Sequence, residues 1–252
     1  MSTLYAYNYP STVMELDGSL IMDSANCAYW SASNEICGYN ANIINSILNN
    51  MDNYFDFNKN FIDIGARYGE FSRGLATKFN HVFAFEPNKK SAALIYTNCL
   101  LNDTINKVDV YNIYLSDKNS TVYFNGWCDE NDININVSKL VNDVVTKYDG
   151  EHLDDSVSKI TSHTLDEYNF DNIGFIKIDT EGYELNILKG AAGTILRNNC
   201  PPILFELLDN SYFKNEQTGE EYKKSIISFL NSLGYSNIIQ YGSDPQNYLA
   251  LK

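Results

Sequence analysis

The chain has 252 residues and a mass of 28.6 kDa, which suits one large α/β domain or a domain of about 200 residues with an extension. Hydrophobic residues make up 44% of the chain and charged residues 20%, a globular composition that excludes disordered and fibrous classes. With 18 Lys and Arg against 32 Asp and Glu, the formal net charge is -14. Because binding to nucleic acid phosphates needs the opposite balance, we expect no nucleic-acid partner.

The cysteines and the lengths of the apolar runs indicate the cellular compartment that we expect for the protein. The five cysteines form no C-x-x-C pair and no cluster with histidine, so neither a disulfide framework nor a zinc site is expected. The first residues lack the basic and apolar regions of a signal peptide, and no apolar run approaches the ~18 residues of a membrane span. We therefore expect a soluble, cytoplasmic protein without a membrane partner.

Residues 1–57 differ from the rest of the chain. They are rich in Tyr, Asn and Ser, and their periodicity is weak until a helical stretch near 41–51 with apolar residues on one face. We expect an N-terminal extension that ends in a helix flanking the main domain. Its tyrosine-rich start is a candidate surface for pairing with a second copy in a homodimer.

From residue 58 onward, short buried strands alternate with helical stretches, which indicates βαβ units and a parallel sheet. The expected strands are 61–64, 81–85, 108–115, 121–124, 175–179, 203–207, 236–241 and 248–251. The expected helices are 70–79, 88–101, 183–197 and 220–233. The stretch of about 125–160 is polar and mixed, and an insertion of that length in a compact domain is more often functional than idle. We therefore expect one domain over 58–252 that carries this insertion.

A glycine turn joins the first of these strands to the following helix. Gly65 and Gly69 bracket the turn, so backbone N–H groups at the start of the helix can approach a ligand closely. Glu86 ends the next strand, 21 residues beyond Gly65, where a carboxylate can accept hydrogen bonds from both hydroxyls of a ribose. Together these features predict a nucleoside-cofactor site rather than ordinary turn residues.

The kind of cofactor follows from the residues around this turn. In the dinucleotide fingerprint G-x-G-x-x-G the middle glycine meets the pyrophosphate, but Arg67 holds that position here. Asp63 ends the preceding strand, where its carboxylate would repel a diphosphate. The acids that could form a wall around the sulfonium and ammonium groups of S-adenosylmethionine are Asp63, Glu86, Asp117 and Asp179. The sequence therefore favours this cofactor over NAD.

Two further carboxylates stand at the end of the strand 175–179. Asp179 ends the strand and Glu181 begins the next helix, so both should face the ligand crevice. Alternation puts Lys177 on the same side as Asp179, and we expect Lys177 to pair with Asp63 rather than to act in catalysis. For Glu181, a helix-start charge and a contact with substrate both stay open. Because a Mg²⁺ site at Asp179 and Glu181 lacks a third obvious ligand, no metal is expected.

Several ordered motifs resemble those of the FkbM-type methyltransferases. They are Phe61-Ile62-Asp63-Ile64-Gly65-Ala66, Ala84-Phe85-Glu86-Pro87, Ser116-Asp117-Lys118, Thr164-Leu165-Asp166, Ile176-Lys177-Ile178-Asp179-Thr180-Glu181-Gly182, Leu188-Lys189-Gly190-Ala191 and Ile203-Leu204-Phe205-Glu206. The resemblance covers roughly residues 58–210 and implies a class I S-adenosylmethionine-dependent O-methyltransferase. The implied fold is Rossmann-like α/β, a seven-stranded, mostly parallel sheet with one antiparallel strand and helices on both faces.

The resemblance also implies which residues bind the cofactor. Carried over by position, they are Asp63, Gly65, Ala66, Arg67, Gly69, Glu86, Ser116, Asp117 and Asp179. Among them, the residues of 63–69 would hold the methionine end and Glu86 the ribose. Ser116 and Asp117 would lie beside the adenine. Arg67 stands where the family commonly has asparagine.

Methyl transfer to an alcohol needs an in-line arrangement and a group that takes the hydroxyl proton. The candidate bases are Asp179 and Glu181, which would face the methyl group and acceptor, and His163, which just precedes the Thr164-Leu165-Asp166 motif and could approach the crevice. We expect O-methylation of a small-molecule or saccharide hydroxyl, with acceptor choice residing in 1–57 and 125–160. The alternatives are an NAD-binding oxidoreductase and a catalytically silent methyltransferase fold that serves as a binding module.

Overall fold

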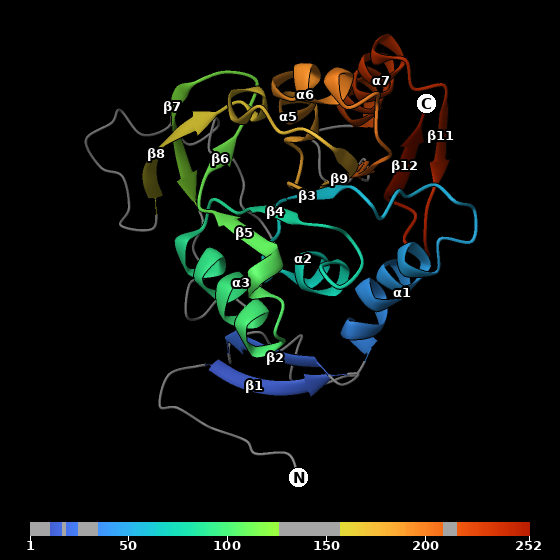
Figure 1. Cartoon of the computed structure of the whole chain (residues 1–252). Coiled ribbons are helices and arrows are strands. Elements are labelled where there is room, and N and C mark those ends of the chain that lie inside the picture. Colours follow the sequence, from blue (N-terminus) through green and yellow to red (C-terminus); the bar gives the residue numbers. More distant parts are fainter. Residues whose placement is uncertain (1–10, 17–18, 25–34, 126–156, 209–215) are drawn as a thin grey trace.

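The computed structural model describes residues 11–16, 19–24, 35–125, 157–208 and 216–252. The strands of its central sheet are β3 (Asn60–Ile64), β4 (Val82–Phe85), β5 (Val108–Tyr111), β9 (Ile173–Ile178), β10 (Ile203–Glu206), β11 (Asn237–Gln240) and β12 (Asn247–Leu251). They follow the order β11-β12-β10-β9-β3-β4-β5 (Figure 1). Strand β12 runs antiparallel to both neighbours, and the other pairs are parallel. The predicted seven-stranded, mostly parallel sheet is confirmed.

Helices cover both faces of this sheet (Figure 1). One face carries α1 (Glu35–Asn49), α2 (Glu70–Leu75) and α3 (Lys89–Leu101), and the other α5 (Glu184–Gly190), α6 (Ala192–Arg197) and α7 (Glu216–Leu233). Alternation along β3 supplies both cores. Phe61 packs in the cluster of α1–α3, whereas Ile62 and Ile64 pack in the cluster of α5–α7. The described part of the chain contains no helix long and apolar enough to cross a membrane.

A smaller sheet and a hairpin stand beside the central sheet. The sheet has the order β6-β8-β7, with β6 (Tyr114–Leu115), β7 (Ser120–Asn125) and β8 (Val157–His163). The hairpin pairs β1 (Ser11–Leu16) with β2 (Ser19–Ser24), and short 3₁₀ helices span Ile105–Lys107 and Leu165–Tyr168. The interior of the predicted insertion, 126–156, and most of the tyrosine-rich N-terminus lie outside the described residues. Acceptor choice and homodimer pairing, which were predicted there, stay predictions.

Two of the predicted elements are divided in the structure. The strand expected over 108–115 ends at Tyr111, and Tyr114–Leu115 instead pairs with β8 in the smaller sheet. The single helix expected over 183–197 is divided into α5 and α6 at Ala191. The division occurs beside Gly190, where an added Cβ would lie only 1.9 Å from the backbone oxygen of Ser116. The tertiary fold brings the backbone of Ser116 into close contact with Gly190. Helical periodicity in the sequence does not reveal such a contact.

The N-terminal helix α1 belongs to the main hydrophobic core rather than to a separate layer. Ile43 and Ile47 are buried in the same cluster as Phe61 and Phe175 of the central sheet. Gly74 of α2 lies against Ile44, since a Cβ added at Gly74 would come within 3.1 Å of the Ile44 Cγ2 atom. Core packing therefore continues across the predicted boundary after residue 57, and the division into an extension and a main domain stays a prediction.

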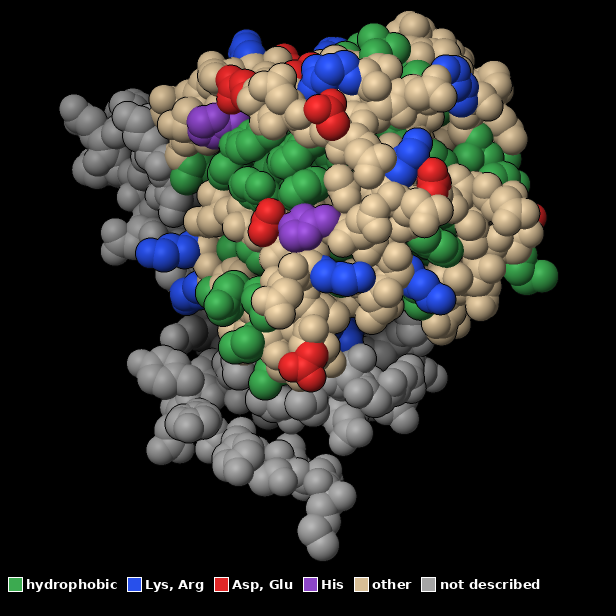
Figure 2. Space-filling view, in the orientation of Figure 1, with side chains coloured by type: hydrophobic (Ala, Val, Ile, Leu, Met, Phe, Trp, Pro, Cys, Tyr) green, Lys and Arg blue, Asp and Glu red, His purple; other side chains and the backbone are tan. Residues whose placement is uncertain are grey.

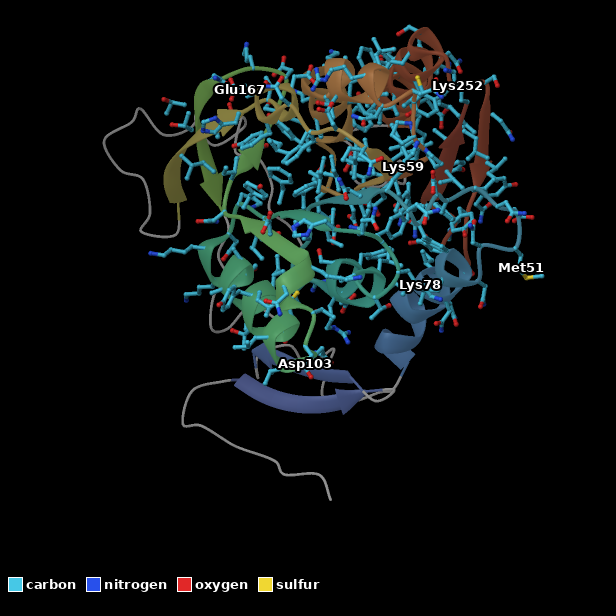
Figure 3. All side chains as sticks on the ribbon, in the orientation of Figure 1. Met51, Lys59, Lys78, Asp103, Glu167 and Lys252 are labelled. Atoms are coloured by element: carbon cyan, nitrogen blue, oxygen red, sulfur yellow. The ribbon has the colours of Figure 1, made fainter. Side chains whose placement is uncertain are left out.

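Substitution Ile47→Ala should lower the free energy of unfolding by about 2–5 kcal/mol, because it removes a fully buried side chain and leaves a cavity. Met51, which is 87% exposed and points away from the fold, provides the matched control (Figure 3). Met51→Ala should change stability by less than about 0.5 kcal/mol. Urea unfolding of both variants measures the difference, and equal effects would show that α1 is not part of the cooperative core.

Candidate cofactor and acceptor site

The turn after β3 lies directly against the end of β9. Gly65 has φ +75°, and a Cβ added there would fall 1.9 Å from the backbone oxygen of Asp179. Only glycine therefore fits, both for the conformation and for the space. The N–H groups of Gly65 and Ala66 both donate to the backbone oxygen of Phe85, at 3.0 Å each. These contacts hold the turn at the carboxyl ends of three neighbouring strands, as the sequence predicted for a ligand site.

Asp63 and Lys177 form a buried charged pair on adjacent strands. Their residues face each other in the parallel register of β3 and β9, and Lys177 Nζ lies 3.7 Å from Asp63 Oδ1. The Ser72 hydroxyl donates to Asp63 Oδ2 at 2.5 Å, and Lys177 Nζ also lies 4.9 Å from the centre of the Phe71 ring. Burial raises the pKa of Asp63, and the Lys177 ammonium opposes that rise. The predicted pairing of Lys177 with Asp63 is confirmed.

Lys177 makes a second ion pair at the ligand side of the sheet. Its Nζ lies 3.2 Å from Oδ2 of Asp179, whose side chain is 44% exposed. Burial lowers the pKa of Lys177, but the adjacent Asp179 and Asp63 carboxylates outweigh it, so the pKa of Lys177 lies above its ordinary value. One ammonium group thus links the methionine-end candidate Asp63 with the acceptor-side candidate Asp179.

Glu86 is held at the end of β4 by the backbone. Its Oε2 accepts from the N–H of Arg67 at 2.9 Å, and its Oε1 accepts from the N–H of Asn88 at 2.8 Å. Arg67 adopts φ +52°, which turns its N–H toward the carboxylate. Burial raises the pKa of Glu86 to about 7, against the effect of these two hydrogen bonds. Glu86 is therefore joined to the glycine turn, and each of its oxygens keeps a further lone pair.

The turn that follows β9 is fastened by Glu184, which the sequence did not single out. Glu184 is fully buried, and its Oε1 accepts from the N–H groups of Thr180 and Gly182 at 2.9 and 3.2 Å. The Tyr222 hydroxyl donates to Oε2 at 2.7 Å. Between the two N–H donors, Glu181 has φ +56°. The buried carboxylate thus fixes the strained turn that presents Glu181.

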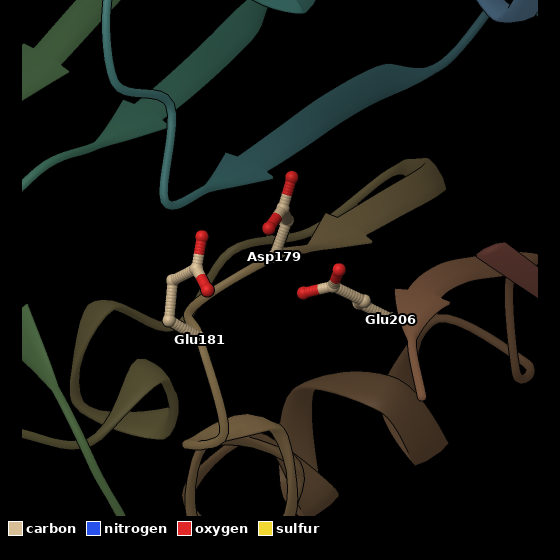
Figure 4. Close-up of side chains that lie close together, drawn as sticks. All are labelled: Asp179, Glu181 and Glu206. Atoms are coloured by element: carbon tan, nitrogen blue, oxygen red, sulfur yellow. The ribbon is translucent and has the colours of Figure 1, made fainter. Parts of the chain in front are cut away.

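Three carboxylates converge at this end of the sheet (Figure 4). One carboxylate oxygen each from Asp179, Glu181 and Glu206 lies within 4.8 Å of the other two. Sequence reasoning assigned no role to Glu206, although alternation along a buried strand could have placed it. Leu204 is level with Lys177 in the register of β10 and β9, so Glu206 is level with Asp179 on the same face. The expectation of no metal stays a prediction: Glu206 adds the third carboxylate that the sequence argument lacked, while the Lys177 ammonium already lies beside Asp179.

The remaining predicted site residues lie on the smaller sheet and the segment around it. Ser116 donates its N–H to the backbone oxygen of His163 at 2.8 Å, and its hydroxyl donates to Asp117 Oδ1 at 3.1 Å. The side chain of His163 is paired with Glu167, with Nδ1 3.1 Å from Oε2. Figure 2 shows the described histidines at the surface of the molecule. The proposed roles of Ser116 and Asp117 at the adenine and of His163 as a base stay predictions.

The sheet order with its single antiparallel strand and the glycine turn after β3 define a Rossmann-like methyltransferase fold. Residues 63–236, more than half of the chain, match the methyltransferase FkbM domain. The chain therefore belongs to the FkbM methyltransferase domain family. A comparison with curated proteins gave no match.

Solved structures of several methyltransferases match this chain. The methyltransferase FkbM from Methylobacillus flagellatus KT has 18% identity and a TM-score of 0.51, over 78% of this chain and 44% of that one. TYW2 from M. jannaschii in complex with AdoMet has 13% identity and a TM-score of 0.45, over 98% and 89%. An O-methyltransferase from Bacillus cereus in complex with SAH has 13% identity and a TM-score of 0.46, over 90% and 86%. The chain thus spans less than half the length of the Methylobacillus protein.

Substitution Lys177→Met should lower the free energy of unfolding by roughly 3–5 kcal/mol, because Asp63 would keep a buried carboxylate without its counter-charge. Lys189→Met, at an exposed position of α5, is the matched control and should have little effect. Adding Asp63→Asn to Lys177→Met should restore part of the loss. Denaturant unfolding of these variants beside the unmodified protein provides the test, and a double variant as unstable as the sum of both changes would contradict the pairing.

Substitution Gly65→Ala should disrupt the first turn, since the new methyl group would overlap the backbone oxygen of Asp179. Gly234→Ala is an informative control, because Gly234 also has a positive φ of +101° but no described atom lies within 4 Å of the position that its new methyl group would take. The control therefore reports backbone strain alone, roughly 1–3 kcal/mol. Thermal unfolding should show a clearly larger loss for Gly65→Ala, and similar losses would remove the argument for close approach.

Proposed function

We propose that the protein is an S-adenosylmethionine-dependent O-methyltransferase that acts on a hydroxyl group of a small molecule or saccharide. The observation that carries this proposal is the row of carboxylates at the carboxyl ends of β3, β4 and β9, next to a glycine turn, in a domain of the FkbM methyltransferase family. The free, buried Cys99 and Cys200 support a reducing, cytoplasmic compartment as part of the proposal.

The charges around the turn suit a cationic cofactor without phosphates. Asp63 Oδ1 is buried, lies 3.7 Å from Lys177 Nζ and accepts no hydrogen bond within the described part of the chain, so it keeps lone pairs for an ammonium group at the methionine end. Glu86 keeps lone pairs for the two ribose hydroxyls. Asp179 extends from the end of β9 toward solvent. S-adenosylmethionine, when bound, supplies an electrophilic methyl group on a sulfonium.

The acceptor side is proposed to be the region of Asp179 and Glu181. A hydroxyl acceptor has to lose its proton, and a base works best when its pKa is near the working pH. Burial and the adjacent Asp179 raise the pKa of Glu181 to about 7, so a substantial fraction of this carboxyl is ionised at neutral pH and can accept the proton. We keep His163 as a second candidate, since Glu167 pairs with its Nδ1 and leaves Nε2 to accept a proton.

Calorimetry with S-adenosylmethionine and with S-adenosylhomocysteine is the direct test of the cofactor. Both should bind, and NAD should not. Tight binding of NAD without S-adenosylmethionine would favour an oxidoreductase. Methyl transfer is then measured with labelled S-adenosylmethionine and a panel of soluble saccharides and small alcohols. Cofactor binding without transfer to any member, unchanged by Asp179→Asn and Glu181→Gln, would favour a silent binding module.

The affinity for S-adenosylmethionine should depend on pH through Glu86. Because the ribose hydroxyls bind the ionised carboxylate and the pKa of Glu86 is about 7, protonation below that pH competes with binding. The dissociation constant should therefore rise as pH falls from 8 to 5.5, by up to about tenfold per unit below the pKa. Glu86→Gln should bind about ten- to a hundredfold more weakly at pH 8 and lose this dependence.

The control for this titration is Glu221→Gln, at an exposed position of α7. This variant should reproduce the affinity and the pH dependence of the unmodified protein. If Glu86→Gln also reproduced them, the ribose assignment of Glu86 would be wrong, whereas the identity of the cofactor would still be decided by the binding experiment above.

A further inference from the structure

We propose that Glu206 is a further catalytic residue, which with Glu181 forms a carboxyl pair that holds one proton beside the acceptor and takes up the second proton from the acceptor hydroxyl. This inference rests on the proposed function for the identity of the reaction. The pairing of the two carboxyls is a property of the protein alone. The pairing of the two carboxyls and their role in the reaction can therefore be disproved separately.

The geometry of the strand ends brings the pair together. Glu206 ends β10, next to β9, on the face of the sheet that also carries Lys177 and Asp63. Figure 4 shows its carboxylate directed toward those of Asp179 and Glu181, which approach from the turn after β9. One carboxylate oxygen of each of the three lies within 4.8 Å of the others. Glu206 Oε2 is buried and has no hydrogen-bond partner in the described part of the chain.

The charges around the pair favour one shared proton. The negative charges of Asp179, Glu181 and Glu184 disfavour ionisation of Glu206, and the nearby ammonium of Lys177 partly offsets them. Three carboxylates in a half-buried cluster cannot all ionise cheaply. Burial first, and then these acids, raise the pKa of Glu206 to about 9, whereas Arg67 and Lys177 limit that of Glu181 to about 7. Asp179 is the member of the cluster that forms an ion pair with Lys177, at 3.2 Å.

The arrangement accounts for the proton in the reaction. The acceptor oxygen forms a bond to the methyl carbon, and the carbon–sulfur bond breaks with its electron pair passing to sulfur. The acceptor O–H bond breaks and its proton passes to the Glu181–Glu206 pair, which goes from one proton to two. The ether, the neutral thioether product and the doubly protonated pair balance the charge, and the pair then returns a proton to water.

The pairing is tested without an acceptor by unfolding the protein at pH 5.5 and pH 8.5. A carboxyl whose pKa is raised in the folded state binds more protons folded than unfolded, so its contribution to stability declines as pH rises above about 4.5. Glu206→Gln and Glu181→Gln should each raise the melting temperature at pH 8.5 by about 2 °C or more. The double variant should gain less than the sum, because either change alone removes the repulsion. Glu221→Gln should match the unmodified protein at both pH values.

Three results would overturn the proposal. Additive gains in melting temperature would show that Glu181 and Glu206 do not share a proton. A Glu206→Gln enzyme that transfers methyl groups to a reactive member of the acceptor panel at the unmodified rate would remove the catalytic role, since we expect a loss of at least about tenfold with unchanged affinity for S-adenosylmethionine. Stimulation of transfer by Mg²⁺ alone, reversed by EDTA, would assign the cluster to a cation. Failure of S-adenosylmethionine to bind would defeat the proposed function and leave the unfolding result interpretable.

Discussion

The buried ion pair of Lys177 with Asp63 is the interaction on which the site depends. Burial of a lysine on a central strand costs free energy, and here the carboxylates of Asp63 and Asp179 compensate for that cost. Because the same ammonium contacts Asp63 and Asp179, the end of β3 and the end of β9 cannot move independently. The glycine turn, whose Gly65 lies against the Asp179 backbone, is fixed by the same contact region. Electrostatic pairing and backbone packing thus define one rigid edge.

Around that edge, the carboxylates differ through their surroundings rather than through their type. Glu184 is fully buried and accepts several hydrogen bonds, so it serves the fold of the turn. Glu86 is tied to two backbone N–H groups and stands beside the glycine turn. For Glu181 and Glu206, burial and like charges oppose ionisation. The same type of side chain therefore has a structural role at Glu184 and the proposed binding and proton-handling roles at the other positions of this small region.

Residue patterns predicted buried strands in a parallel sheet, the glycine turn and the pairing of Lys177 with Asp63, and the family resemblance added the seven-stranded arrangement with one antiparallel strand. They did not reveal β8, whose polar run Ser158–Ser162 gives little hydrophobic alternation, or the break between α5 and α6. Glu206 was visible as the end of a strand, but its position opposite Asp179 depends on the register of β10 with β9. Contacts between distant segments carry the information that was missing.

The pairing of β7 with β8 has a consequence for how this chain can diversify. Asn125 and Val157 are partners at the end of that antiparallel ladder, so the segment between them begins and ends at neighbouring positions. Lengthening such a segment twofold costs only about 0.6 kcal/mol of closure entropy. The sequence between these two residues can therefore be exchanged, lengthened or shortened during evolution while the strand-end carboxylates keep their positions. The segment in which the sequence predicts acceptor choice is thus one that can change without rebuilding the domain.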